Sequence, residues 1–384
     1  MYATKRSLWR PAILVLILLS FILAACGGQI ANGNWPGIAV SGKNVYVAFG
    51  PGLVTVDATN CTQNWAFPAE FGQSPLYYAA PAVAETEVIV GDYGTSGGLF
   101  SSGPRITITA LRPAENGTPT VLWSRDDLVK DRIIAPPLLT DNQVFIGTAD
   151  NQLFALDKAT GEEQWRFETG HSIWGQPTYR DGVVYLTSLD SKVYALSADN
   201  GAVRWETELS GAIAARPVLD GNLLYVSSFD NKVHALSLET GDEVWAAEAE
   251  NWVWAAPAVT EEAIYYADIA GNVYAADASS GRVLWSQKVA GAVQTTPAYA
   301  NGNLYVVSGD VSGDNELRRG HLTALSAIDG NQQWQQETSV PLFTDPVIVN
   351  ETVVIVTQGA GPLLYVYNLE SGSQLCQFTL ESGE

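Results

Sequence analysis

The chain has 384 residues, of which 47% are hydrophobic and 16% are charged, and this composition is too apolar for a disordered protein. Forty-one acidic residues against 20 basic ones give a net charge of −21, which repels phosphate backbones and excludes nucleic-acid binding through a basic patch. With 35 glycines, 16 tyrosines and 12 tryptophans, the composition favours strands over long helices.

Residues 1–25 predict a secretory signal peptide. Lys5, Arg6 and Arg10 precede an apolar run over residues 11–23, which is short for a membrane span. The segment Leu-Ala-Ala-Cys-Gly at residues 23–27 resembles the bacterial lipobox, which implies cleavage before Cys26 and a diacylated Cys26 that anchors the protein to a membrane. Residues 26–34 are then a lipidated tether, and the folded part lies outside the cytoplasm, in the periplasm or at the cell surface. The alternative is an ordinary secreted protein.

A repeat of about 40 residues runs through the rest of the chain. Each unit contains a proline, two strand patterns separated by a turn, a Thr-Gly pair or a close variant of it, and a tryptophan. The marker tryptophans are Trp65, Trp123, Trp165, Trp205, Trp245, Trp285 and Trp334. Their spacings are 58, 42, 40, 40, 40 and 49 residues, and Cys376 stands 42 residues beyond the last of them.

Periods near 40 residues with about four strands per unit are typical of a β-propeller, in which each blade packs against two neighbours. Eight units therefore predict an all-β, eight-bladed propeller with four-stranded blades over residues 35–384. The alternatives fit the spacing less well, because a pair of β-sandwiches gives no fixed period and a β-helix gives a much shorter one.

The segment Ala-Leu-Asp-Lys-Ala-Thr-Gly-Glu-Glu-Gln-Trp at residues 155–165 resembles the tryptophan-docking repeat of the pyrroloquinoline-quinone (PQQ) propellers. The resemblance covers residues 35–384. This family includes quinoprotein dehydrogenases and non-enzymatic outer-membrane assembly lipoproteins of the BamB type. The resemblance implies the architecture and the docking of the seven marker tryptophans on neighbouring blades, but it leaves the function open because propellers carry many unrelated sites.

Cysteines replace both docking residues at one junction. A glycine stands four residues before the marker position in units three to eight, at Gly161, Gly201, Gly241, Gly281, Gly330 and Gly372. In the first unit this position is Cys61, and in the last unit the tryptophan is replaced by Cys376. Because the family's docking rule sets a tryptophan against this glycine of the next blade, the resemblance implies that a Cys61–Cys376 disulfide closes the ring. The alternative is a pair of unrelated buried thiols.

No catalytic motif is evident. The chain lacks the vicinal cysteines of quinoprotein dehydrogenases, a nucleophile elbow and a phosphate-binding loop, so we predict no catalytic residues, no metal and no cofactor, with PQQ and calcium as the alternative. His171, His234 and His321 fall at unrelated repeat positions without metal-ligand spacing. His234 stands where the preceding unit has Tyr194, which favours a strand residue over a ligand.

Two insertions fall between the second and third strands of their units, at residues 92–105 and 309–320. Strand alternation places these loops on the same face as the links between blades, so both insertions are expected on one rim. The second insertion contains Asp310, Asp314 and Glu316, but it lacks the spacing of an EF-hand calcium loop. We interpret it as a solvated acidic loop, with weak calcium binding as the alternative.

An aromatic binding funnel is predicted where this rim meets the central channel. Alignment of the units on their second strands places these residues at one equivalent position, three residues before each innermost strand: Trp35, Tyr78, Ile134, Trp174, Ala214, Trp254, Gln294 and Phe343. Five of the eight are aromatic, and Trp252, Arg216 and His171 are expected close by. Aromatic side chains in a concave mouth favour recognition of an extended apolar or planar ligand. The alternative is that they fill the channel as a small core.

The function that best fits these patterns is that of a non-catalytic, lipid-anchored, extracytoplasmic scaffold that binds a protein or peptide on one propeller face, as the similarity to BamB-type lipoproteins implies. Two alternatives remain: a quinoprotein-type oxidoreductase that uses PQQ, and a cell-surface carbohydrate-binding module, since exposed aromatic rings stack on sugars. We expect a monomeric propeller whose partners are a membrane and a protein.

Overall fold

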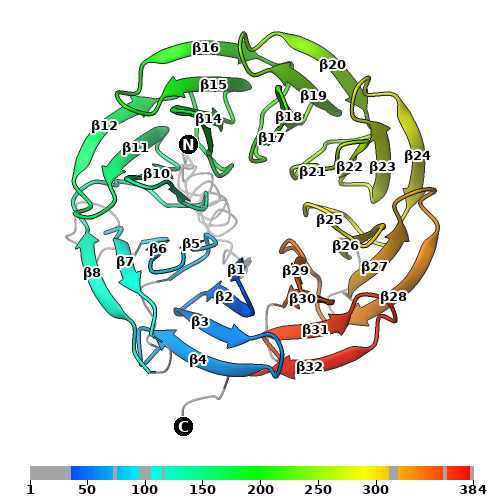
Figure 1. Cartoon of the computed structure of the whole chain (residues 1–384), viewed down its shortest axis with the longest axis horizontal. Helices are drawn as coiled ribbons and strands as arrows, with labels where there is room; N and C mark the ends of the chain where they lie inside the picture. Colours follow the sequence, from blue (N-terminus) through cyan, green and yellow to red (C-terminus); the bar gives the residue numbers. More distant parts are fainter. Residues whose placement is uncertain are drawn as a thin grey trace, which may run out of the picture. The chain divides into compact units, whose positions relative to one another are not determined.

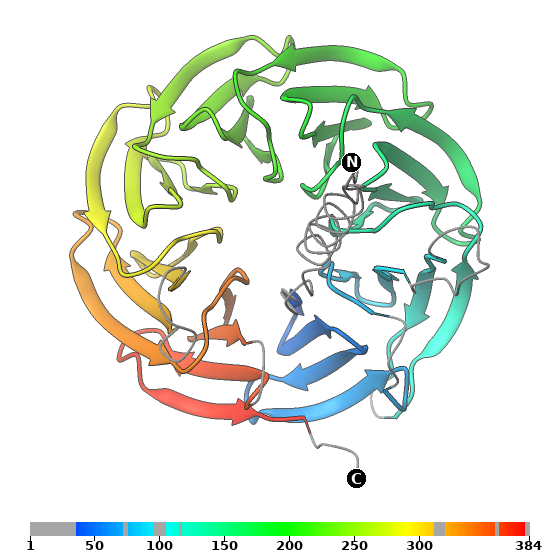
Figure 2. The ribbon, with the colours of Figure 1, turned by 180° about the vertical axis from the view of Figure 1, so that it is seen from behind.

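The structure is a computed structural model that describes residues 36–71, 76–94, 105–114, 117–310, 319–357 and 361–380. Within these residues, 32 strands form eight antiparallel sheets of four strands each. The sheets stand around one axis as the blades of a propeller, so the predicted fold class is confirmed (Figures 1 and 2). The predicted signal peptide, Cys26, the tether and Trp35 lie outside the described residues.

Each blade consists of four strands that are consecutive in the sequence, and the innermost strand comes first. Blades 1 to 4 contain β1 (Gly37–Ser41), β2 (Asn44–Phe49), β3 (Gly52–Asp57) and β4 (Thr62–Phe67); β5 (Ala82–Val83), β6 (Val88–Gly91), β7 (Ile108–Arg112) and β8 (Thr120–Arg125); β9 (Leu138–Leu139), β10 (Gln143–Gly147), β11 (Gln152–Asp157) and β12 (Glu163–Glu168); β13 (Thr178–Arg180), β14 (Val183–Thr187), β15 (Lys192–Ser197) and β16 (Val203–Glu208). Blades 5 to 8 contain β17 (Val218–Asp220), β18 (Leu223–Ser228), β19 (Lys232–Ser237) and β20 (Glu243–Glu248); β21 (Ala258–Val259), β22 (Ala263–Ala267), β23 (Asn272–Asp277) and β24 (Val283–Lys288); β25 (Ala298–Ala300), β26 (Asn303–Gly309), β27 (Gly320–Ser326) and β28 (Gln332–Thr338); β29 (Val347–Val349), β30 (Thr352–Val356), β31 (Leu364–Asn368) and β32 (Gln374–Phe378).

The middle strands of each blade are apolar on both faces because each face packs against a neighbouring blade. In β2, Val45 and Val47 belong to the core between blades 1 and 8, whereas Tyr46 and Ala48 belong to the core between blades 1 and 2. Successive side chains of a strand point to opposite faces, so one continuous apolar run serves two interfaces. Eight such clusters lie between consecutive blades around the ring.

One face of the propeller, which we call the link face, carries both the links between blades and the loops between second and third strands. Backbone hydrogen bonds join the two kinds of segment, for example from the N–H of Phe229 to the carbonyl of Ala212 and from the N–H of Ile269 to the carbonyl of Trp252, both at 3.0 Å. The two predicted insertions begin where β6 and β26 end on this face. Residues 95–104 and 311–318 of these insertions lie outside the described residues.

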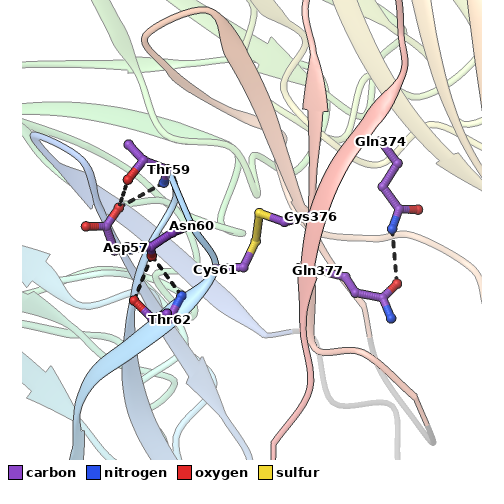
Figure 3. The surroundings of a disulfide bond; sticks show 8 residues. All are labelled: Asp57, Thr59, Asn60, Cys61, Thr62, Gln374, Cys376 and Gln377. Atoms are coloured by element: carbon purple, nitrogen blue, oxygen red, sulfur yellow. Dashed lines mark hydrogen bonds between the residues drawn. A yellow bond between two sulfur atoms is a disulfide. The ribbon is translucent and has the colours of Figure 1, made fainter.

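A disulfide joins Cys61 and Cys376, which are 315 residues apart in the sequence and have Cα atoms 6.0 Å apart. It connects the turn between β3 and β4 to the outermost strand β32, so it links blade 1 to blade 8 (Figure 3). Blades 1 and 8 are each built from consecutive strands and share none. The disulfide is therefore the covalent closure of a ring that otherwise closes through side-chain packing and hydrogen bonds, such as that from the Thr344 hydroxyl to the Pro36 carbonyl.

Candidate functional site

The central channel of the propeller contains a cavity of about 670 Å³ whose wall includes residues of all eight blades. Most of the wall consists of alanine, proline and aliphatic side chains at the start of the innermost strands, such as Pro81, Pro136 and Pro297. This volume lies within the range of ligand-binding clefts, and an apolar wall with few polar groups is typical of such sites.

Two tryptophans from non-adjacent blades meet in the channel wall. Trp174 belongs to the link between β12 and β13, Trp254 belongs to the link between β20 and β21, and their ring centroids are 6.2 Å apart. The equivalent position of the blade between them is Ala214. Its small side chain leaves the space in which the two indole rings come together.

A stack of three rings continues from the channel wall to the outer surface of the link face. Phe229 lies between Trp254, at 5.0 Å between ring centroids, and Trp252, at 5.2 Å. The side chain of Trp252 is 47% exposed. We call Trp174, Phe229, Trp252 and Trp254 the aromatic cluster. The cluster therefore offers ring surface to solvent at Trp252 and to the channel at Trp174 and Trp254, and an apolar or planar group can stack on either surface.

Sequence reasoning missed Phe229. It lies in the loop between β18 and β19, where the preceding repeat has Leu189 and the following one has Ile269. An apolar residue at the same position of three successive loops is a signal that the repeat alignment contained. This signal lies in the loops between second and third strands, whereas the predicted funnel positions lie in the links between blades.

The other predicted funnel residues occupy different surroundings. Tyr78 packs edge-on against Tyr93, with centroids 4.8 Å apart, and Phe343 lies close to Gly309, at the end of β26. His171 is exposed, and its Nδ1 accepts a hydrogen bond from the N–H of Ser172. Of the described funnel residues, Trp174, Trp254 and Arg216 belong to the cavity wall. The cavity wall therefore includes two of the four described aromatic residues at the equivalent position, Trp174 and Trp254.

The channel wall also carries two opposite charges. The carboxylate of Asp345 accepts a hydrogen bond of 2.8 Å from the N–H of Thr296, which belongs to the neighbouring blade. Burial raises the pKa of Asp345, against the effects of the Thr296 N–H and of the positive charge on Arg216. Arg216 is exposed to the channel, and it makes no ion pair or hydrogen bond with other described residues.

Six marker tryptophans lie directly against the glycine of the next blade. A Cβ atom built on Gly161, Gly201, Gly241, Gly281, Gly330 or Gly372 would come within 2.4–2.7 Å of the indole of Trp123, Trp165, Trp205, Trp245, Trp285 or Trp334, respectively. Five of these indoles donate a hydrogen bond of 2.8–3.0 Å to a carbonyl of the next blade. The Nε1 of Trp245 has no acceptor among the described residues. Trp65 is buried between blades 1 and 2 and packs against Tyr46.

The remaining two histidines are buried strand residues. In β19, His234 lies between the carboxylates of Glu243, at 2.6 Å from Nδ1, and Asp230, at 3.1 Å from Nε2. In β27, the Nε2 of His321 lies 3.5 Å from Asp310, at the base of the second insertion. Among the described residues, no group of three or more histidine, cysteine, aspartate or glutamate side chains is placed to hold a metal ion. Asp314 and Glu316 lie outside the described residues.

No helix long and apolar enough to cross a membrane occurs in the described part of the chain.

Comparison with known proteins gives one matching family, and the similar solved structures include the two named here. The family described as outer membrane protein assembly factor BamB matches residues 95–229, 168–252 and 230–384, which together exceed half of the chain. The crystal structure of BamB from Moraxella catarrhalis has a TM-score of 0.65 at 18% identity and covers 87% of this chain and 91% of that chain. The computationally designed protein Ika8 has a TM-score of 0.70 at 14% identity, with 87% and 96% covered. At these identities the two structures show a shared fold alone. A search of curated proteins found no match.

Proposed function

Because the chain belongs to the family of outer membrane protein assembly factor BamB, we propose that it is an extracytoplasmic scaffold that binds a protein or peptide partner on its link face. The observation that carries this proposal is the aromatic cluster, which exposes Trp252 and continues through Phe229 and Trp254 to the channel wall. Partly exposed tryptophans backed by other rings supply a large and rigid contact area, which is typical of the anchor residues of protein interfaces.

The proposed scaffold is attached to a membrane through a diacylated Cys26. Two acyl chains anchor a protein stably, whereas one chain gives marginal binding. The variant Cys26→Ser is expected to be released in soluble form or to stay unprocessed, as measured by fractionation and by mass spectrometry of the N-terminal peptide. A Cys26→Ser variant that is still processed and membrane-bound contradicts this part of the proposal.

The partner site is tested by crosslinking in native membranes followed by capture of the propeller and identification of the bound proteins. We expect the double variant Trp252→Ala with Phe229→Ala to lose a partner that the unchanged protein captures. The matched control is Tyr179→Ala, which removes another exposed aromatic side chain, 41% exposed, from the innermost strand β13.

Thermal unfolding distinguishes a binding surface from a structural core. If the aromatic cluster recognises a partner, the double variant folds and melts close to the unchanged protein while its capture falls. A large drop in melting temperature with the partner still captured contradicts the proposal, because truncation of a core aromatic residue costs about 3 to 5 kcal/mol.

A further inference from the structure

Arg216 is a cation that faces the central channel of an acidic protein. Several other arginines are paired with carboxylates, such as Arg125 with Asp127 and Arg166 with Glu163, whereas Arg204, in the outer strand β16, and Arg282, directly before the outer strand β24, are exposed without an ion pair to the described residues. Arg216 instead presents its guanidinium to the channel, and it has neither an ion pair nor a hydrogen bond to the described residues. A guanidinium has five N–H donors in a planar fork that matches the two oxygens of a carboxylate. These donors are available to a ligand that enters the channel.

The charge on Asp345 does not satisfy Arg216. The two groups are close enough for Arg216 to lower the pKa of Asp345, yet they form no ion pair, and one oxygen of Asp345 already accepts the N–H of Thr296. Burial has the larger effect and raises the pKa of Asp345. The N–H donors of Arg216 are therefore not used by Asp345.

The wall around Arg216 is mostly apolar, and its polar side chains are those of Gln176, Gln294, Thr296 and Asp345. Trp174 and Trp254 belong to the flanking blades, and Ala214 and Ala255 complete this part of the wall. The cavity of about 670 Å³ has room for a small ligand or the end of a chain but not for a folded element. An anion-binding fork beside tryptophan rings fits a carboxylate that carries an apolar group.

We infer that the channel binds the C-terminal residue of the partner, with its terminal carboxylate on Arg216 and an apolar last side chain against Trp174 and Trp254. This inference rests on the proposed function, and it names the part of the partner that enters the channel. An internal acidic residue fits less well, because it brings peptide groups on both sides into a wall rich in proline and alanine, where few donors and acceptors are present. A chain end brings peptide groups on one side only.

The test compares two five-residue peptides, both acetylated and ending in phenylalanine, one with a free C-terminal carboxylate and one with a C-terminal amide. Binding to the full chain, purified in detergent, is measured by calorimetry and by tryptophan fluorescence. The free acid is expected to bind at least about tenfold more tightly than the amide, as a charge-assisted hydrogen-bonded pair requires. Arg216→Gln is expected to abolish this difference, and Arg216→Lys to retain part of it.

The matched control is Arg204→Gln, which removes the same charge from the exposed outermost strand β16 and is expected to leave the preference unchanged. Equal binding of acid and amide overturns the inference, as does a preference that survives Arg216→Gln. Decanoate that binds with the same dependence on Arg216, while neither peptide binds, also overturns it by assigning the site to a small amphiphile. In each of these cases, loss of the captured partner in the Trp252 and Phe229 variant still supports the proposed function separately.

Discussion

Asp345 is the acidic group in the wall of the central channel, and burial raises its pKa. A carboxyl group with a raised pKa in the folded state binds its proton more tightly there than in the unfolded chain. The folded state therefore loses stability as the pH rises from the ordinary value of 3.8 through the raised one, and the whole cost is present above the raised pKa.

The variant Asp345→Asn is expected to raise the melting temperature at pH 7 and to leave it nearly unchanged at about pH 3, since the amide keeps an oxygen that can accept the Thr296 N–H. Thermal unfolding at both pH values checks this. Asp220→Asn, at an exposed position of β17, is the control and is expected to change little. A less stable Asp345→Asn variant at pH 7 shows that attraction to Arg216 exceeds the cost of burial.

The pKa of Asp57 is shifted in the opposite direction to that of Asp345. Its hydrogen bond with Lys43, at 2.6 Å, and those from Thr59 hold the pKa of Asp57 at about 2, below its ordinary value of 3.8. A carboxylate with a lowered pKa stabilises the folded state at pH values above its ordinary pKa of 3.8. This contribution disappears as the pH falls through about 2.

We expect Asp57→Asn to lower the free energy of unfolding by about 1 to 2 kcal/mol at pH 7, a range that allows for solvent screening of the exposed Lys43, and by much less at pH 2. Urea unfolding at the two pH values measures the difference. Lys43→Met is the control, because it removes the ion pair and keeps the bonds from Thr59, so it is expected to cost only part of this amount. Equal losses of stability at both pH values contradict a lowered pKa for Asp57.

At the scale of elements, the docking of a tryptophan on the next blade depends on a glycine with a left-handed backbone. Gly241 has a φ of +76°, and a Cβ atom there would lie 2.6 Å from the indole of Trp205. Gly182 has nearly the same φ, +77°, in the turn between β13 and β14, but a Cβ atom there would meet nothing within 4 Å. The two positions therefore separate the cost of the backbone conformation from the cost of displacing the tryptophan.

Gly182→Ala is expected to cost about 1 to 2 kcal/mol, from the left-handed conformation alone. Gly241→Ala is expected to cost about 1 to 3 kcal/mol more, because the indole of Trp205 has to move out of its packed position. Denaturant unfolding of both variants checks the difference, and a shift of the tryptophan fluorescence to longer wavelength reports exposure of the displaced ring. Similar losses at the two positions mean that the docking contact contributes little to stability.

The strands and their order were predictable from the sequence because they depend on local patterns. Apolar runs such as Val-Tyr-Ala-Leu at residues 193–196 and Leu-Phe-Ala-Leu at residues 153–156 form strands that are buried on both faces, and the 40-residue period gives the number of blades. The aromatic cluster was predictable only in part. The equivalent positions of Trp174 and Trp254 follow from the repeat, but their contact depends on the small size of Ala214 in the blade between them.

For the whole molecule, the junction between blades 1 and 8 joins segments from the two ends of the folded chain. Cys61 has a φ of +56°, the left-handed conformation that glycines adopt at the equivalent positions of blades 3 to 8. Its N–H donates to the carbonyl of Asp57, as the N–H of Gly161 does to the carbonyl of Asp157. Cys61 therefore occupies the docking turn without being a glycine, and its bond to Cys376 replaces the missing tryptophan contact.

Replacement of both cysteines by serine is expected to lower the stability by up to about 5 to 6 kcal/mol, because a disulfide across 315 residues restricts a very long loop in the unfolded chain. Denaturant unfolding measures this loss, and mass spectrometry of unreduced peptides checks the bond in the unchanged protein. The double variant Cys61→Gly with Cys376→Trp introduces the docking residues of the other junctions and is expected to recover part of the loss. Free thiols at both positions of the unchanged protein contradict the predicted loss.

The sequence by itself determined the eight blades, because every repeat unit contains the same local patterns. Together with the resemblance to the PQQ propellers it also indicated the pair of cysteines that closes the ring, since these two residues depart from the repeat at its docking positions. Only the tertiary structure decided which side chains meet in the channel. Phe229 stacks between Trp252 and Trp254, and Arg216 faces the channel without an ion pair to the described residues, because these arrangements depend on the directions of side chains from different blades and on the space that their neighbours leave.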